Sequence, residues 1–273
     1  MSPLLIDFAG WLAKKWAGDF HHSYQVTASV HWTWYRKNFD RTTWACTSLS
    51  DALHKYSWAG KDYEENKKHL DTYAAALQSS LRLGANAQAE ACCIDIMDWG
   101  NVRTRSTREW LATLGKSGEL CERLSGAIAA LKAGETSRFN SPEDLLMNSG
   151  TTKIYSLGDS SDALIIYDGR VGAALGYLAA QFLTQRGEEE LPEEFGFMWG
   201  QSRLTKQGHH HRNPSVGPYK FRALGVGNYR NGQHADMVVR GSKLIDNLSQ
   251  QTGVTPREWE AALFMVGYEL PGS

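Results

Sequence analysis

A lysine and an aspartate, fifteen residues apart, are the side chains of this sequence best suited to covalent chemistry. Lys153 follows the short turn Gly150-Thr151-Thr152, and Asp168 follows the apolar run at residues 164–167. A neutral amine can attack a sugar carbon and form a Schiff base, and a carboxylate stabilises the positive charge that develops there. The amine must lose its proton first, which requires burial or a nearby cation, and Arg170 is the candidate cation. The pair therefore predicts cleavage of the bond between a base and its deoxyribose.

A helical hairpin is predicted around the lysine. Ser141 as N-cap, Pro142 at the first helical position and two acids in the first turn predict a short helix that runs to Met147. The pattern breaks at residues 148–150, and residues 152–157 form the second short helix. Backbone N–H groups at such a turn can bind a phosphate oxygen without any side chain. The residues expected to make this contact are Ser149, Gly150, Thr151 and Thr152.

Helical spacing also dominates the rest of the chain. Asp168 is predicted to cap a helix over residues 169–183, which would hold its carboxylate ionised and fixed in direction. Further helices are predicted at residues 4–15, 63–83, 85–99, 106–114, 118–133, 235–248 and 256–267. Residues 187–232 are predicted to be largely irregular, and a small strand near residues 164–167 remains an alternative. The fold class is therefore mainly α, with residues 1–273 forming one compact domain.

Charge is unevenly distributed along a nearly neutral chain. The formal net charge is −1, which argues against a surface that binds nucleic acid indiscriminately. Residues 195–235 nevertheless contain no Asp or Glu and carry six Lys or Arg residues, including Arg203, Arg212 and Lys220. This basic segment is either a plain exposed loop or a DNA-binding surface, and the sequence favours neither.

Metal, cofactor and membrane signals are weak. The four cysteines have no metal-binding spacing and are interpreted as reduced core thiols, and the consecutive histidines at 209–211 would point in different directions. We therefore expect no metal and no cofactor. The N-terminus lacks a secretory signal and no run of apolar residues is long enough to span a membrane, so a cytoplasmic location is expected.

Aromatic residues offer a candidate pocket for an extruded base. Trp32, Trp34 and Tyr35 lie beside basic residues, and Trp199 lies in the basic segment, so all four are candidates for stacking on a base. The alternative for Trp32, Trp34 and Tyr35 is an amphipathic helix packed into the core, and it is the favoured interpretation.

The residues around Lys153 and Asp168 resemble the helix-hairpin-helix DNA glycosylases, in the 8-oxoguanine-glycosylase-like branch with a catalytic lysine. The resemblance rests on Gly150-Thr151-Thr152-Lys153 and on Leu164-Ile165-Ile166-Tyr167-Asp168. It implies a helical bundle in two packed lobes, with 141–183 as the hairpin and catalytic segment. It also implies that Lys153 is the Schiff-base nucleophile and Asp168 its activating partner.

A divergent bacterial group within that superfamily is also similar. Its Thr-Lys step, its Ile-Tyr-Asp-x-Arg-Val segment and its Arg-Asn-Pro-Ser run match residues 152–153, 166–171 and 212–215. Some members are thought to act on phage DNA, so this resemblance implies a hypermodified cytosine, such as glucosylated hydroxymethylcytosine, as a candidate substrate beside an oxidised base. The expected partner is double-stranded DNA with a modified base, the product an abasic site, and strand scission by the AP lyase reaction follows if the Schiff base forms. No obligate protein partner is inferred.

Two other functions remain open at this point. A helical DNA-binding protein without catalysis would use the hairpin to grip phosphate, with Lys153 adding only charge. A protein-interaction module would use the tryptophans as contact residues. The three hypotheses differ in whether the protein binds DNA and whether a lysine reacts with it.

Overall fold

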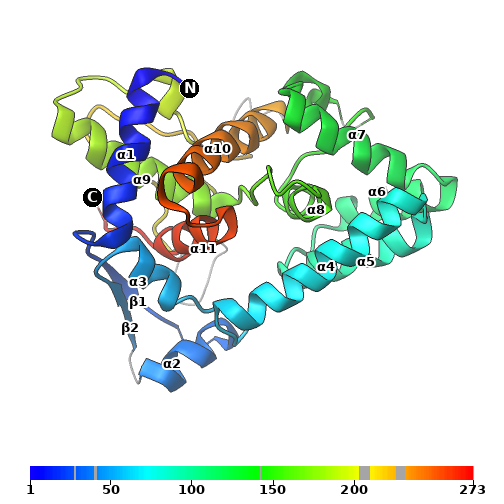
Figure 1. Ribbon diagram of the computed structural model, residues 1–273, viewed down its shortest axis with the longest axis horizontal. Helices are drawn as coiled ribbons and strands as arrows, with labels where there is room; N and C mark the ends of the chain where they lie inside the picture. The colour runs from blue at the N-terminus through cyan, green and yellow to red at the C-terminus, as the bar shows by residue number, and fades with distance from the viewer. Residues whose placement is uncertain (28, 40–41, 142, 203–209, 226–230, 273) are drawn as a thin grey trace. The chain divides into compact units, whose positions relative to one another are not determined.

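A computed structural model describes residues 1–27, 29–39, 42–141, 143–202, 210–225 and 231–272. The chain is mainly helical, as the sequence predicts (Figure 1). Its internal contacts divide it into two compact units. The first unit consists of Met1–Glu64, Asp168–Tyr229 and Lys243–Ser273, and the second of Glu65–Tyr167 and Arg230–Ser242.

The first unit is built mainly of four packed helices. They are α1 (Pro3–Ala17), α3 (Leu49–His54), α9 (Gly169–Arg186) and α11 (Pro256–Val266). Both α11 and α1 pack against α3 and α9 (Figure 1). The predicted start of α11 is confirmed, because Thr255 and Glu258 form a capping box with Pro256 at the first helical position.

The first unit contains a small antiparallel sheet that was not predicted from the sequence. Strands β1 (His22–Gln25) and β2 (Thr43–Cys46) pair with His22 opposite Cys46 and Gln25 opposite Thr43. Each strand has only four residues, too few to show a clear period-2 pattern. The short elements between them are the 3₁₀ helix η1 (Val30–Trp32) and the helix α2 (Thr33–Phe39). Residues 164–167, where a strand was an alternative, are irregular.

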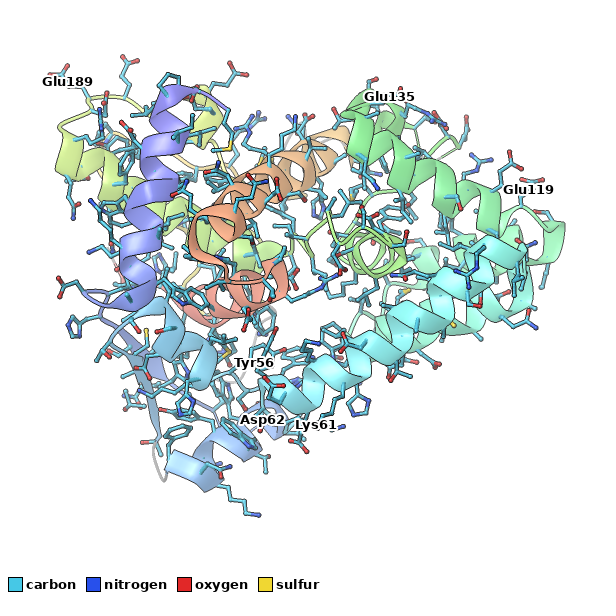
Figure 2. All side chains as sticks on the ribbon, viewed as in Figure 1. Tyr56, Lys61, Asp62, Glu119, Glu135 and Glu189 are labelled. Atoms are coloured by element: carbon cyan, nitrogen blue, oxygen red, sulfur yellow. The ribbon has the colours of Figure 1, made fainter. Side chains whose placement is uncertain are left out.

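The second unit consists of helices that lead to a short buried one. Its helices are α4 (Tyr63–Leu83, whose first two residues belong to the first unit), α5 (Asn86–Trp99), α6 (Arg105–Ser117), α7 (Leu120–Ala133) and α8 (Thr151–Gly158). Figure 2 shows Glu119 and Glu135 at the two ends of α7. Glycines with positive φ end α6 and α7, namely Gly118 at 78° and Gly134 at 76°. α8 packs against α5 and α7.

The predicted first helix of the hairpin is wrong. Residues 143–147 form a turn and an irregular segment, preceded by the 3₁₀ helix η2 (Thr136–Asn140), and Pro142 lies outside the described residues. Side chains outside this segment hydrogen-bond to the carbonyl groups that a helix would use. Arg123 donates to the carbonyls of Glu143 and Asp144, and the Tyr155 hydroxyl donates to the Leu146 carbonyl at 2.6 Å. These tertiary hydrogen bonds override the local helix signals.

The C-terminal half contains a long helix and a largely irregular segment. Helix α10 (Asn231–Thr252) is longer than predicted at both ends, and it continues from the second unit into the first. In the described part of residues 187–225, the structure is irregular apart from η3 (Glu193–Phe195) and isolated bridges. All four cysteines are free thiols. No helix within the described ranges is long and apolar enough to cross a membrane.

Candidate active site

Asn148 organises the turn that precedes Lys153. Its side-chain oxygen accepts hydrogen bonds from the backbone N–H of Gly150 at 2.8 Å and of Thr151 at 3.2 Å, and its carbonyl accepts from the N–H of Thr152 at 3.0 Å. Its side-chain amide donates to the buried Thr107 hydroxyl at 3.0 Å. The asparagine therefore satisfies the first N–H groups of α8 and ties them to α6.

These hydrogen bonds leave fewer backbone N–H groups available for the predicted phosphate contact. The N–H groups of Gly150, Thr151 and Thr152 already donate within the chain, and these three residues are buried. Ser149 is exposed, and its N–H has no hydrogen-bond partner among the described residues. DNA contact at this turn stays a prediction, and Ser149 is its available donor.

Replacing Asn148 by alanine is expected to destabilise the protein by about 2 kcal/mol, because α8 loses a capping acceptor and the buried Thr107 hydroxyl loses a partner. Urea unfolding measures the effect. Asn148→Asp is the matched control: it keeps the capping oxygen and is expected to cost about half as much or less. An alanine variant as stable as the wild type would show that this network contributes nothing.

Lys153 is a buried lysine. It is 5% exposed, and its Nζ donates to the carbonyl of Ser149 at 2.9 Å. Its side chain runs along Gly100, the residue that ends α5: a Cβ added there would lie 2.7 Å from Lys153 Cδ and 2.8 Å from Cε. Position 100 thus leaves room for the lysine only because it carries no side chain. The burial that nucleophilic use of the amine requires is present.

Asp159 shapes the connection that leads from α8 toward Asp168, and the sequence analysis missed it. Its carboxylate accepts from the N–H groups of Ser161, Ala163 and Leu164 at 3.2, 2.9 and 3.2 Å. Lys132 also donates to it at 3.1 Å. Burial raises the pKa of Asp159, but the hydrogen bonds from Ser161 and Lys132 outweigh burial and lower the pKa below its usual value. The signal in the sequence is an aspartate two residues before a serine, typical of an Asx turn.

The end of this connection is hydrogen-bonded back to α8. The N–H of Tyr167 donates to the Thr152 hydroxyl at 3.2 Å. The Tyr167 carbonyl lies 2.8 Å from Nε2 of His234, and since a carbonyl only accepts, this nitrogen is the donor. The N–H of Ile165 donates to the Ser242 hydroxyl at 3.1 Å. Thr152 and Tyr167 are the residues that directly precede Lys153 and Asp168. The fold therefore brings together the two positions immediately before the predicted catalytic pair.

Asp168 begins the first unit's α9, as predicted. Its Oδ1 accepts from the N–H groups of Arg170 at 2.8 Å and Val171 at 3.2 Å, which makes it the N-cap. Gly169 and Gly200 touch through their backbones, since the N–H of Gly200 donates to the carbonyl of Gly169 at 3.0 Å and a Cβ on Gly169 would lie 2.5 Å from Gly200 Cα. Lys153 belongs to the second unit and Asp168 to the first.

The predicted DNA-binding cations have different surroundings. Arg170 lies against aromatic rings of the first unit, and the Nε of Arg212 donates to the carbonyl of Tyr268 at 2.9 Å. Lys220 is exposed in the same unit, whereas Arg203 lies outside the described residues. Contact between these cations and DNA stays a prediction.

Two of the four predicted base-pocket residues lie in the core of the first unit. Trp32 and Tyr35 are 1% exposed and pack edge to face, with ring centroids 5.9 Å apart. Trp34 is half-buried and packs against Phe39, and the Nε1 of half-buried Trp199 donates to the carbonyl of Phe221 at 3.3 Å. For Trp32 and Tyr35, the structure agrees with the core interpretation that the sequence favoured.

Two further observations concern metals and known proteins. Within the described ranges, no group of three or more His, Cys, Asp or Glu residues could hold a metal ion. No protein-family model matches the chain, and neither curated proteins nor solved structures include a significant match.

Proposed function

We propose that the protein is a DNA glycosylase that excises a modified base by using Lys153 as nucleophile and Asp168 as its charge-stabilising partner. The observation that carries this proposal is the hydrogen bond between Thr152 and Tyr167, at 3.2 Å. Each of these residues is bonded directly to one member of the pair, and consecutive Cα atoms lie about 3.8 Å apart. Thr152 and Tyr167 are themselves fifteen residues apart in sequence, and both belong to the second unit.

Burial and capping also support this chemistry. Lysine side chains are seldom buried, and Lys153 is only 5% exposed. Burial favours the neutral amine that a nucleophilic lysine requires. The N–H groups of Arg170 and Val171 favour the ionised form of the Asp168 side chain. A fixed carboxylate costs no reorganisation when positive charge develops on the sugar.

The proposed reaction forms one bond and breaks another at C1′ of the deoxyribose. The Nζ lone pair of Lys153 bonds to C1′, and the electron pair of the glycosidic bond leaves with the base, which takes up a proton. The lysine nitrogen then loses a proton and its lone pair forms the C=N bond of the Schiff base, while the C1′–O4′ bond breaks with its electron pair on O4′, which takes up that proton. Hydrolysis of the Schiff base releases an abasic site, and β-elimination from it would instead cut the strand.

Borohydride trapping tests the proposal. The wild-type protein, mixed with duplexes that carry oxidised, hydroxymethylated or glucosylated bases, is expected to give a covalent adduct with at least one duplex, because reduction fixes the Schiff base. Lys153→Gln should abolish the adduct and retain binding to the same DNA. Lys116→Gln, which removes an exposed lysine from the same unit, is the control for a nonspecific reaction and should still give the adduct.

The other outcomes identify the alternatives. DNA binding without any adduct or released base indicates the non-catalytic DNA-binding protein. Absence of salt-dependent DNA binding contradicts both DNA functions and favours the interaction module. Equal excision from duplexes with normal and glucosylated cytosine would contradict the phage-directed role.

A further inference from the structure

Arg170 occupies an aromatic cage in the first unit. Its guanidinium carbon lies 4.9 Å from the ring centroid of Trp58, 4.3 Å from that of Phe264 and 4.9 Å from that of Tyr268. Rings bind the faces of a guanidinium and leave the N–H groups at its edges unsatisfied. Among the described residues, no side chain or carbonyl forms a hydrogen bond or ion pair with the Arg170 guanidinium. The cage thus holds a cation whose N–H groups have no acceptor within the described part of the chain.

Arg212 lies beside the same cage. Its guanidinium carbon is 5.7 Å from the Tyr268 ring centroid, and its Nε donates to the Tyr268 carbonyl at 2.9 Å. This hydrogen bond fixes the direction of the side chain. The two terminal nitrogens have no hydrogen-bond partner within the described ranges. Tyr268 therefore holds two guanidinium groups, one through its ring and one through both ring and carbonyl.

The charge of this cluster is not balanced. Burial lowers the pKa of Arg170 and of Arg212, and the charge of Arg170 lowers the pKa of Arg212 further. The Asp168 carboxylate opposes this effect at both arginines. Two guanidinium groups and one carboxylate leave a net charge of +1 in a half-buried, aromatic-lined site, where charge is weakly screened.

We propose that Arg170 and Arg212 form a half-buried binding site for a phosphate monoanion. A phosphodiester carries one negative charge, which matches the excess, and its two free oxygens accept the edge N–H groups of planar guanidiniums. In DNA, this anion is a backbone phosphate. The proposal of a DNA source rests on the proposed glycosylase function, because Asp168 is the third member of the cluster. The site would then hold the phosphate of the nucleotide on which Asp168 acts.

This site differs from a diffuse basic surface. Exposed lysines attract the DNA backbone through charge alone and give a small effect each, spread over all linkages. Two planar guanidiniums whose terminal N–H groups have no acceptor among the described residues select one phosphate and lose affinity when that phosphate becomes neutral. The distinction is measurable one linkage at a time.

The test measures DNA affinity with single methylphosphonate linkages, each of which removes one backbone charge. Lys153→Gln serves as the parent protein, so that no reaction occurs during binding. One linkage next to the modified base is expected to weaken binding about tenfold, the size of one charge-assisted hydrogen bond. Adding Arg212→Gln should weaken binding to unmodified linkages by a similar factor and remove the penalty at that linkage alone. If no linkage loses its penalty in the Arg212→Gln protein, the proposal is wrong.

Three controls distinguish a loss of charge, a loss of guanidinium geometry and a loss of folding as causes of weaker binding. Lys14→Gln removes one exposed charge from the same unit and should change affinity less than about twofold, without changing the penalty at any linkage. Arg212→Lys keeps the charge but loses the planar fork, and is expected to restore only part of the affinity. Thermal unfolding of each variant without DNA establishes that it is folded; should Arg212→Gln fail this check, Arg212→Lys carries the comparison.

Inorganic phosphate distinguishes a free anion from DNA as the source. If the protein binds no DNA but phosphate raises the melting temperature of the wild type and not that of the Arg212→Gln variant, the site is supported while the glycosylase proposal fails. If borohydride trapping gives an adduct but no methylphosphonate linkage loses its penalty in the Arg212→Gln protein, the glycosylase proposal is supported and the phosphate site is not. A protein that shows neither linkage coupling nor phosphate stabilisation has no such site.

Discussion

Asp168→Asn is expected to reduce base excision by about 10³-fold or more while leaving the protein folded. The amide oxygen still accepts from the N–H groups of Arg170 and Val171, and asparagine is as good an N-cap as aspartate, so the start of α9 is retained. What disappears is the negative charge that stabilises the developing sugar cation. Single-turnover release of the modified base measures the loss, and urea unfolding should show a change within about 1 kcal/mol.

The same substitution should tighten DNA binding. The Asp168 carboxylate raises the pKa of both Arg170 and Arg212. Without its charge, the cluster changes from +1 to +2, so a phosphate binds more strongly there. Slower excision together with a lower Kd is a combination that simple unfolding cannot produce. A variant with wild-type excision rates would contradict the catalytic assignment of Asp168.

Local signals were enough to predict most helices. Residues 63–83 match α4 in full, because their apolar residues follow a helical period and the following glycine, Gly84, has a φ of 65°. The caps of α9 and α11 were also predictable, since Asp168 and Thr255 stand directly before helix-forming runs. Each of these signals depends only on residues within one or two helical turns.

The hairpin shows where local signals fail. Residues 141–147 contain an N-cap serine and early acids, yet the carbonyls of residues 143, 144 and 146 are claimed by Arg123 and Tyr155. Arg123 lies about twenty residues away in sequence, so no local pattern reports its hydrogen bonds. The two four-residue strands were missed for the same reason, because each is defined by its partner.

The sequence was enough to predict the candidate catalytic pair, but not the residues that hold the backbone around it. Lys153 and Asp168 stand out by chemistry and by resemblance, but Asn148 and Asp159 act through backbone N–H groups whose direction depends on the fold. The cage around Arg170 was also hidden, because Trp58, Phe264 and Tyr268 come from segments more than two hundred residues apart. Sequence spacing carries no information about such convergence.

Gly100→Ala is expected to lower base excision about 100-fold with little loss of stability. Gly100 has a φ of −72°, which alanine adopts readily, so the backbone is not strained. The new methyl group would stand 2.7 Å from Lys153 Cδ, and the flexible lysine side chain is the part that moves. A nucleophile displaced by about 1 Å loses about two orders of magnitude in rate. The measurement is single-turnover excision, with borohydride trapping to follow formation of the adduct.

Gly126→Ala is the matched control for this experiment. Gly126 lies within α7 of the same unit, and an added Cβ there meets nothing within 4 Å. Alanine should stabilise the helix by up to about 1 kcal/mol and leave the excision rate unchanged. A Gly100→Ala protein as active as Gly126→Ala would mean that the position of Lys153 does not matter for the reaction. If Gly100→Ala instead loses stability in proportion to activity, the methyl group has disturbed α5 rather than the lysine, and the contact with Lys153 is not its main effect.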